Sequence, residues 1–341
     1  MKRRNFIKNT SKAGVALSFL GVYACKENTP PKSSSEEKID TFTPFFKLSL
    51  AQWSVHKLIW EEKLDPMDFA KKAKEWGFEG LEYVSQLYTK EIEKRGNNSE
   101  AIISLAEDLK KVSDQYHMKN QIMMVDLQGD ENLLVTPNVE HRKKAIENHK
   151  VWIDATAVLG CESMRINLFG SNDEAVWKEN AIASLTELSD YAASKNVNVI
   201  VENHGYLSSN AAIMAEVMKI VNKPNCGTLP DFGNFCLKRE GNELWGTPCI
   251  EEYDIYKGVE ELMPFAKGVS AKSFNFDESG NETSIDFYKM MKIVKDAGFN
   301  GFVGVEYEGE TLSEEKGILA TKELLLKVAK QLNTSTNKTK A

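Results

Sequence analysis

The residues Val199-Ile200-Val201-Glu202-Asn203-His204-Gly205 form a short apolar run that ends in polar side chains and a glycine. An uninterrupted apolar run of this length is typical of a strand that is buried on both faces of a parallel sheet. Seven further runs have the same form, so the sequence predicts eight strands. Their ranges are Lys47–Trp53, Gly80–Val84, Asn120–Val125, Ser163–Leu168, Val197–Asn203, Cys226–Asp231, Gly268–Ser273 and Gly301–Tyr307.

Segments of helical length separate these runs, and their apolar residues recur at spacings of three and four. One helix is predicted over residues 139–159, and another over residues 286–297. Asp65 is the predicted N-cap of a third helix. The 288 residues from 45 to 332 divide into eight strand–helix units of 36 residues, which predicts a closed (β/α)8 TIM barrel. The alternative is an open doubly wound sheet, which usually has fewer strands and a GxGxxG motif that is missing after the first strand here.

Composition restricts the kind of protein. Hydrophobic residues make up 42% of the 341, with 21 glycines and 9 prolines, as in a folded globular chain. The formal net charge is −7. This acidic balance argues against a nucleic acid partner, because binding to a phosphate backbone requires a basic surface.

The first 24 residues are predicted to be an export signal. Arg3 and Arg4 precede an apolar run of about a dozen residues, which is too short to cross a bilayer core of about 30 Å. The paired arginines resemble a twin-arginine signal, and Val22-Tyr23-Ala24-Cys25 resembles a bacterial lipoprotein cleavage box, which predicts lipidation of Cys25. The alternative is a signal peptide that is cut nearby without lipid attachment. Either event leaves an exported protein, periplasmic or anchored to a membrane through lipid alone.

The remaining chain is predicted to have three parts. Residues 25–44 are rich in Ser, Pro, Lys and Glu and are predicted to form a flexible tether, residues 45–332 the barrel, and residues 333–341 a disordered tail. Loss of residues 1–24 removes five basic residues and no acidic ones, which leaves 38 basic against 50 acidic residues and a charge of −12.

Four cysteines follow Cys25, and their spacing suggests no zinc site. Cys236 and Cys249 could pair across one loop in an oxidising compartment, or could be buried free thiols. The sequence leaves both possibilities open.

Polar and charged side chains lie at the carboxyl ends of the predicted strands, where TIM barrels carry their active sites. Three of them, Glu202, Asp231 and Glu306, end different strands after apolar runs. Together in one barrel mouth these carboxylates would repel one another, and a divalent cation with a preference for oxygen ligands, Mn²⁺ or Mg²⁺, would remove that repulsion. A single acid at a strand end is more often a solvated or helix-capping group, and only the set of three favours a metal site.

Alternation along a strand places further side chains in the same mouth. Glu202 and His204 are predicted to face the same way, as are Ser270 and Lys272. The other candidates for substrate contact at strand ends are Trp53, Glu82, Arg165, Asn167 and Asn234. Trp53 and Trp60 are either core residues or surfaces for stacking of a sugar.

Three motifs resemble one known family: Val201-Glu202-Asn203-His204-Gly205, Pro230-Asp231-Phe232-Gly233-Asn234-Phe235 and Gly304-Val305-Glu306-Tyr307. The chain over residues 45–332 is similar to the sugar phosphate isomerase/epimerase proteins of the xylose isomerase-like TIM barrel superfamily, which includes the AP endonuclease family 2 type. The resemblance implies that Glu202, Asp231 and Glu306 hold a metal ion together with a histidine from the seventh strand. That histidine is missing: its place falls at about Ser270, and Lys272 can project into the site instead. Asn234 stands where many members carry a substrate-binding histidine.

These residues predict a sugar isomerase or epimerase that transfers a proton next to a carbonyl. Glu202 and Glu306 are the candidate bases, and Lys272 or a bound cation would stabilise the enediolate. An exported enzyme would act on a non-phosphorylated sugar or glycoside. One alternative is a 3-keto-glycoside lyase with the same site, and another is a non-catalytic anchored barrel that binds sugar. A metal-dependent phosphoesterase related to the repair enzymes would need a histidine-rich cluster of several metals. It is disfavoured because the chain has five histidines, only one of them at a predicted strand end, and because its charge is acidic. The oligomeric state is left open.

Overall fold

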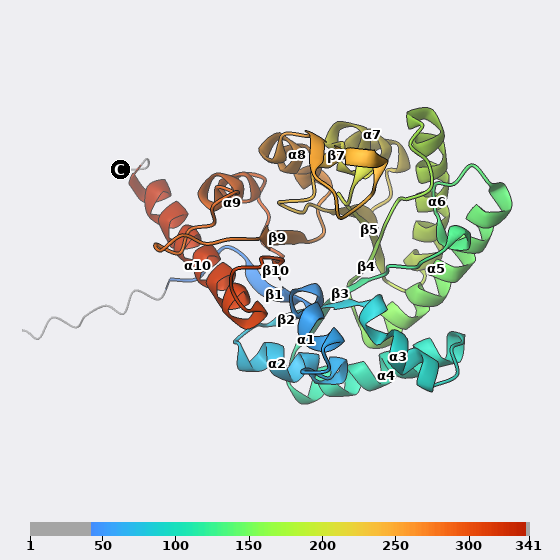
Figure 1. The fold of residues 1–341 in the computed structure, drawn as a ribbon, viewed down its shortest axis with the longest axis horizontal. Helices are drawn as coiled ribbons and strands as arrows, with labels where there is room; N and C mark the ends of the chain where they lie inside the picture. Colours follow the sequence, from blue (N-terminus) through green and yellow to red (C-terminus); the bar gives the residue numbers. More distant parts are fainter. Residues whose placement is uncertain (1–41, 339–341) are drawn as a thin grey trace, which may run out of the picture. The chain divides into compact units, whose positions relative to one another are not determined.

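The computed structural model describes residues 42–338 (Figure 1). The predicted signal peptide, Cys25 and residues 25–41 of the tether lie outside the described residues. Ordered structure reaches across two of the predicted boundaries within the described part. Phe42, at the end of the predicted tether, packs against the barrel core because its ring is apolar. The last helix, α10 (Glu314–Lys338), extends six residues past residue 332, so the first part of the predicted disordered tail is helical. A helix that is already formed adds further turns at low cost.

Eight parallel strands form one sheet in the order β6-β5-β4-β3-β2-β1-β10-β9 (Figure 1). All eight predicted strands are confirmed, with ends that coincide or differ by at most two residues. Their bounds are β1 (Lys47–Ala51), β2 (Gly80–Val84), β3 (Lys119–Met124), β4 (Ser163–Ile166), β5 (Asn198–Glu202), β6 (Cys226–Leu229), β9 (Val269–Ser273) and β10 (Phe302–Tyr307).

The sheet closes into a barrel between its two outermost strands. Parallel bridges pair Thr228 with Ala266 and Asp231 with Ser270, and the backbone N–H of Ser270 donates to the carbonyl of Pro230 at 2.9 Å. The predicted (β/α)8 TIM barrel is therefore confirmed, and the open-sheet alternative is wrong.

Helices surround the barrel and alternate with its strands (Figure 1). The predicted helix starts and stops are confirmed: the Asp65 side chain accepts a hydrogen bond from the N–H of Met67, and Gly160 ends α5 with φ +79°. The helices are α1 (His56–Trp60), α2 (Phe69–Glu75), α3 (Thr89–Lys94), α4 (Ser99–Gln115), α5 (Val139–Leu159), α6 (Glu174–Ala193), α7 (Ala211–Val221), α8 (Ile255–Leu262), α9 (Phe287–Asp296) and α10. Among the described residues, no helix is long and apolar enough to span a membrane.

The strands place apolar and polar side chains on alternate faces. On β10, Val303 and Val305 are fully buried hydrophobic residues, while Gly304 and Glu306 alternate with them. A Cβ atom at Gly304 would lie 2.5 Å from the carboxylate oxygens of Glu82, so only glycine leaves room for this acid. The barrel interior is therefore polar at the level where the acids lie.

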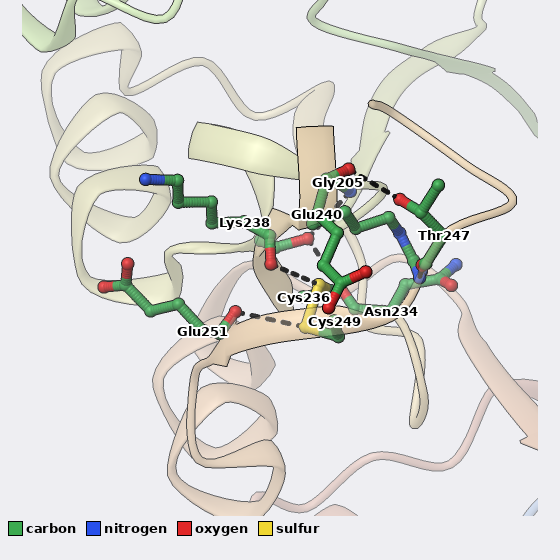
Figure 2. Close-up of a disulfide and its surroundings, with 10 residues drawn as sticks. Gly205, Asn234, Cys236, Lys238, Glu240, Thr247, Cys249 and Glu251 are labelled. Carbon is green, nitrogen blue, oxygen red and sulfur yellow. Dashed lines mark hydrogen bonds between the residues drawn. A yellow bond between two sulfur atoms is a disulfide. The ribbon is translucent and has the colours of Figure 1, made fainter. Parts of the chain in front are cut away.

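An antiparallel hairpin follows β6 and was not predicted from the sequence. Its strands are β7 (Cys236–Arg239) and β8 (Cys249–Glu252), and a disulfide joins Cys236 to Cys249 with a Cα–Cα distance of 5.8 Å (Figure 2). Of the two possibilities that the sequence left open for these cysteines, pairing is the correct one. All four residues of β8 are exposed, so no apolar alternation marks this strand in the sequence.

Candidate functional site

Three carboxyl groups from different strands meet inside the barrel mouth. Glu202 ends β5, Asp231 follows β6 and Glu306 lies on β10, and each offers an oxygen atom within 4.8 Å of the others. The three residues are at most 4% exposed. The predicted convergence of these acids is therefore present in the structure.

Ser270 on β9 joins two of these acids. Its Oγ lies 2.6 Å from Oδ2 of Asp231 and 2.6 Å from Oε2 of Glu306. A hydroxyl has one proton and can donate to only one of these oxygens at a time. Either one of the two carboxyl groups carries a proton, or a cation balances their charge.

Backbone geometry fixes the orientation of Asp231. Its Oδ1 accepts hydrogen bonds from the N–H groups of Gly233 and Asn234, both at 2.8 Å. The side chain of Asn203 binds the N–H and the carbonyl of Asp231 at 2.8 and 3.0 Å, which fixes the end of β6 to the end of β5. Asn203 of the first family motif thus holds the backbone of Asp231 in the second motif.

Burial controls the protonation of the acidic cluster. It raises the pKa of Asp231 to about 7, although the nearby Lys272 ammonium opposes this shift. Burial also raises the pKa of Glu202 well above its ordinary value, and the charge of Arg165 offsets this only in part. The cluster therefore holds a proton readily near neutral pH.

Lys272 lies within this cluster as the prediction required. Its Nζ is 3.0 Å from Oε1 of Glu308, 3.5 Å from Oε1 of Glu306 and 3.9 Å from Oδ2 of Asp231. Burial alone would lower the pKa of Lys272, but the acids, Asp231 first, outweigh it and raise the pKa well above its ordinary value. Asn234 connects the two sides of the cluster: its Nδ2 donates to Glu202 at 3.0 Å, and its Oδ1 accepts from Lys272 at 3.3 Å.

A second polar network adjoins Glu202. Arg165 on β4 places Nε 2.9 Å from Oε2 of Glu202 and Nη1 2.5 Å from Oδ1 of Asp126. Asn167 donates to the same Asp126 oxygen at 2.6 Å and directs its own Oδ1 to Nδ1 of His204 at 2.9 Å. Burial would raise the pKa of Asp126, but Arg165 outweighs it and the pKa lies below its ordinary value. Arg165 is therefore held between two acids.

His204 is a neutral imidazole in this environment. Burial, helped by the charge of Arg165, holds the pKa of His204 well below its ordinary value. Because Nδ1 faces the Asn167 oxygen, the network assigns the proton to Nδ1. The unprotonated Nε2 is then suited to accept a hydrogen bond from a sugar hydroxyl.

Glu82 lies inside the barrel beside Gly304. Ser49 donates to its Oε1 at 2.5 Å, and its Oε2 has no hydrogen-bond partner among the described residues. Burial raises the pKa of Glu82 to about 8. Its predicted contact with substrate stays a prediction.

Trp53 lies in an aromatic group. Its ring stacks on His56 with centroids 4.3 Å apart and meets the edge of Trp60 at 5.4 Å. These contacts hold Trp53 in place, and no contact described for it reaches the acidic cluster. A stacking role for Trp53 stays a prediction.

Three residues near the site were not among the predicted site residues. Asp126 follows the end of β3 by two residues, as Asp231 follows the end of β6, and this position past a strand end is a signal that the sequence carries. Glu308 follows Glu306 by two residues. Side chains alternate along a strand, so the sequence alone would predict that these two glutamates face the same way. Trp245, which lies 4.6 Å from the His204 ring, comes from the hairpin loop and has no sequence signal of this kind.

The donor set of the cluster fits a divalent metal ion. Glu202, Asp231 and Glu306 provide three buried carboxylate oxygens, which are the ligands that hard divalent cations prefer. Ser270 adds a hydroxyl oxygen between two of them, where the resemblance placed a histidine. Lys272 and Arg165 already offset part of the negative charge of the three acids. Less of that charge therefore remains for a metal ion to balance than in a cluster of three isolated acids.

Fold and site together define a (β/α)8 barrel with an acidic centre at the carboxyl ends of its strands. A family model described as xylose isomerase-like TIM barrel matches residues 70–328. The chain therefore belongs to this family.

Solved structures of sugar epimerases have the same fold. L-ribulose 3-epimerase is 12% identical, with a TM-score of 0.64 over 87% of this chain and 98% of that chain. The 3-keto-D-glucoside 4-epimerase YcjR from E. coli is 12% identical, with a TM-score of 0.57 over 77% of this chain and 94% of that chain. One curated relative, the C-glycoside deglycosidase alpha subunit of Microbacterium trichothecenolyticum, is 30% identical over 69 residues. That match spans 20% of this chain and 17% of the relative.

Proposed function

We propose that this protein is an enzyme that moves a proton on a carbon next to a carbonyl group of a non-phosphorylated sugar or glycoside. One observation carries the proposal: Glu202 and Glu306 project from different strands into one buried cluster that also holds the ammonium of Lys272. Burial raises the pKa of Glu202, and a buried carboxyl group of this kind is suited to accept and return a proton near neutral pH. The names of the sugar epimerases with the same fold support this class of reaction.

The two acids have different surroundings, which suits two different roles. Glu202 is held by Arg165 and Asn234, while Glu306 is held by Ser270 and Lys272. One carboxylate would take the proton from the substrate carbon, and the other would return a proton from the opposite side. Proton return on the opposite side inverts that carbon, whereas return to the neighbouring carbon exchanges an aldose and a ketose.

The negative charge that develops on the substrate oxygen has to be stabilised. Lys272 is a buried ammonium group that is already oriented by neighbouring acids, so it needs little rearrangement to meet that charge. A divalent cation, Mn²⁺ or Mg²⁺, held by Glu202, Asp231 and Glu306 would supply Lewis-acid polarisation of the same oxygen. His204, Asn167 and Arg165 would orient the sugar hydroxyls next to the cluster.

Hydrogen exchange tests the proposed reaction. Purified protein is incubated in deuterated water with a panel of ketoses and 3-keto-glycosides, and deuterium on carbon is followed by NMR. Wild type should introduce deuterium next to the carbonyl, and Glu202→Gln and Glu306→Gln should each reduce the rate by at least about 100-fold. No exchange with any member of the panel would contradict the proposal, and binding without exchange would support a non-catalytic sugar-binding barrel.

A second candidate reaction is cleavage of a 3-keto-glycoside by elimination. The same base removes the proton on the carbon next to the ketone, a carbon–carbon double bond forms, and the bond to the aglycone breaks with its electron pair. The aglycone then takes up a proton. The 30% identity to a segment of a C-glycoside deglycosidase subunit favours this candidate. Product analysis separates the two, because only elimination releases an aglycone.

We further propose that the protein is exported from the cytoplasm. The disulfide between Cys236 and Cys249 supports a location outside the reducing cytoplasm. Lipidation at Cys25 would anchor the enzyme to a membrane. Labelling with radioactive palmitate should mark wild type but not Cys25→Ala, and equal labelling would contradict the anchor.

A further inference from the structure

The β7–β8 hairpin carries an exposed tryptophan to the barrel mouth. Trp245 is 43% exposed, yet its ring centroid lies 4.6 Å from that of His204 at an interplanar angle of 46°. The Phe169 ring lies 6.1 Å from the same imidazole. Exposed tryptophan surface next to the site is unfavourable in water and is typical of a surface that binds a ligand.

Several contacts hold this tryptophan in place. The disulfide ties the two hairpin strands together, and Figure 2 shows Thr247 bound to the backbone of Glu240 across the loop. The Arg239 guanidinium lies 5.8 Å from the Trp245 ring centroid and donates to the carbonyl of Thr247 at 2.7 Å. The tryptophan is thus presented on a braced loop.

A strained residue connects the hairpin loop to the site. Tyr206 has φ +49°, a left-handed conformation that is uncommon for a tyrosine, directly after Gly205 at φ +96°. Its hydroxyl donates to the carbonyl of Asn242 in the hairpin loop. Backbone strain of this kind persists where surrounding contacts require it, and it concentrates at functional sites. Here the strained turn directly follows His204, and the Tyr206 side chain extends from it to the hairpin loop.

A cavity of about 250 Å³ lies next to Leu244, the chain neighbour of Trp245; Trp245 itself flanks this cavity and is not one of its lining residues. The loop after β4 contributes Phe169 and Asn172, the turn after His204 contributes Tyr206, and the hairpin contributes Leu244. Two aromatic rings and a leucine provide flat apolar surface, while Asn172 offers a polar group at the edge. A cavity with these walls suits one flat ring that carries polar substituents.

We propose that Trp245, Phe169, Tyr206 and Leu244 form a subsite for the aromatic aglycone of a glycoside whose sugar lies at the acidic cluster. The inference rests on the proposed function only for the position of the sugar. His204 lies between the two parts, because it contacts Asn167 on the side of the cluster and the Trp245 ring on the side of the subsite. An aromatic ring stacks on these residues with a larger apolar area than a methyl group does.

Binding of matched glycosides tests the subsite. Phenyl and methyl β-glycosides of glucose, galactose, mannose and xylose are titrated into the purified protein by calorimetry. Wild type should bind at least one phenyl glycoside about 10-fold or more tightly than its methyl counterpart. Trp245→Ala should abolish this preference and leave the affinity for the methyl glycoside unchanged. Ile250→Ala, an exposed apolar residue of the same hairpin, is the matched control and should keep the preference.

A second variant keeps the test decisive if Trp245→Ala fails to fold. Cys236→Ser/Cys249→Ser releases the hairpin and should weaken the phenyl preference while methyl glycosides bind as before. The subsite is overturned if wild type binds no phenyl glycoside, shows no preference, or keeps the preference in Trp245→Ala. Failure of the proposed reaction is recognised separately, because it would abolish deuterium exchange in wild type and leave the phenyl preference intact.

Discussion

Lys272 and Glu306 lie directly opposite each other on the neighbouring strands β9 and β10, with Nζ of the lysine 3.5 Å from Oε1 of the glutamate. A lysine that is 1% exposed is uncommon unless acids surround it. Here three acids do so, and the barrel therefore carries its own positive charge at the centre of the acidic cluster. This arrangement distinguishes the site from one in which metal ions alone balance the carboxylates.

Replacement of the buried ammonium should destabilise the protein. We expect Lys272→Met to lower the free energy of unfolding by about 3 kcal/mol, because the acids around it lose a buried partner. Urea denaturation measures this effect. Lys257, an exposed lysine near Glu261, offers the control Lys257→Met, which should leave stability unchanged. Equal stability of Lys272→Met and wild type would show that the ammonium contributes nothing to the charge balance of the cluster.

Glu82 should make stability depend on pH. Its pKa is about 8 in the folded protein against 4.5 for an ordinary glutamate, so the folded state binds this proton more tightly than the unfolded state. Stability from this group therefore falls as the pH rises from about 4.5 to about 8. Glu82→Gln should be more stable than wild type at pH 8.5, by a few kcal/mol, and the difference should shrink toward pH 4.5. Denaturation curves across this range provide the measurement; a difference that is independent of pH would argue against burial as the cause.

Metal content should depend on the three acids. We expect elemental analysis of purified wild type to find Mn²⁺ or Mg²⁺, and Asp231→Asn to lose most of it. Dialysis against a chelator should reduce deuterium exchange, and the same ion should restore it. Glu278→Gln, a change at an exposed acid that is not one of the three clustered carboxylates, is a control that should retain the metal. Full metal content in Asp231→Asn would remove this aspartate from the ligand set.

The disulfide should stabilise the hairpin. Cys236 and Cys249 are separated by 13 residues, and closure of a loop of this size contributes about 3 kcal/mol in the chain-entropy model. We expect Cys236→Ser/Cys249→Ser to increase hydrogen exchange of amides in residues 236–252 while the barrel strands stay protected. The half-buried free thiol of Cys226 provides the control Cys226→Ser. Unchanged hairpin exchange in the double variant would show that side-chain contacts suffice to hold the loop.

The barrel could be predicted from the sequence because buried parallel strands require apolar runs and helices require a three-to-four-residue period. The acids could be predicted for a related reason. Glu202, Asp231 and Glu306 interrupt or end apolar strands, and parallel strands bring their carboxyl ends to one edge.

The remaining contacts depend on tertiary geometry that a single sequence does not carry. The pairing of Arg165 with both Asp126 and Glu202 requires the registers of three strands. The place of Trp245 beside His204 depends on a hairpin whose second strand is exposed and has no apolar alternation. The cysteine pairing that fixes this hairpin was one of two equally open possibilities.

The closure of the barrel between β6 and β9 has a consequence for how the acidic cluster forms. The closure between β6 and β9 pairs Asp231 with Ser270, and the side chains of the same two residues share a hydrogen bond in the acidic cluster. A nascent chain that lacks its final hundred residues has neither a continuous wall nor a complete set of reacting groups. The wall of the barrel and its acidic cluster are therefore completed by the same two residues.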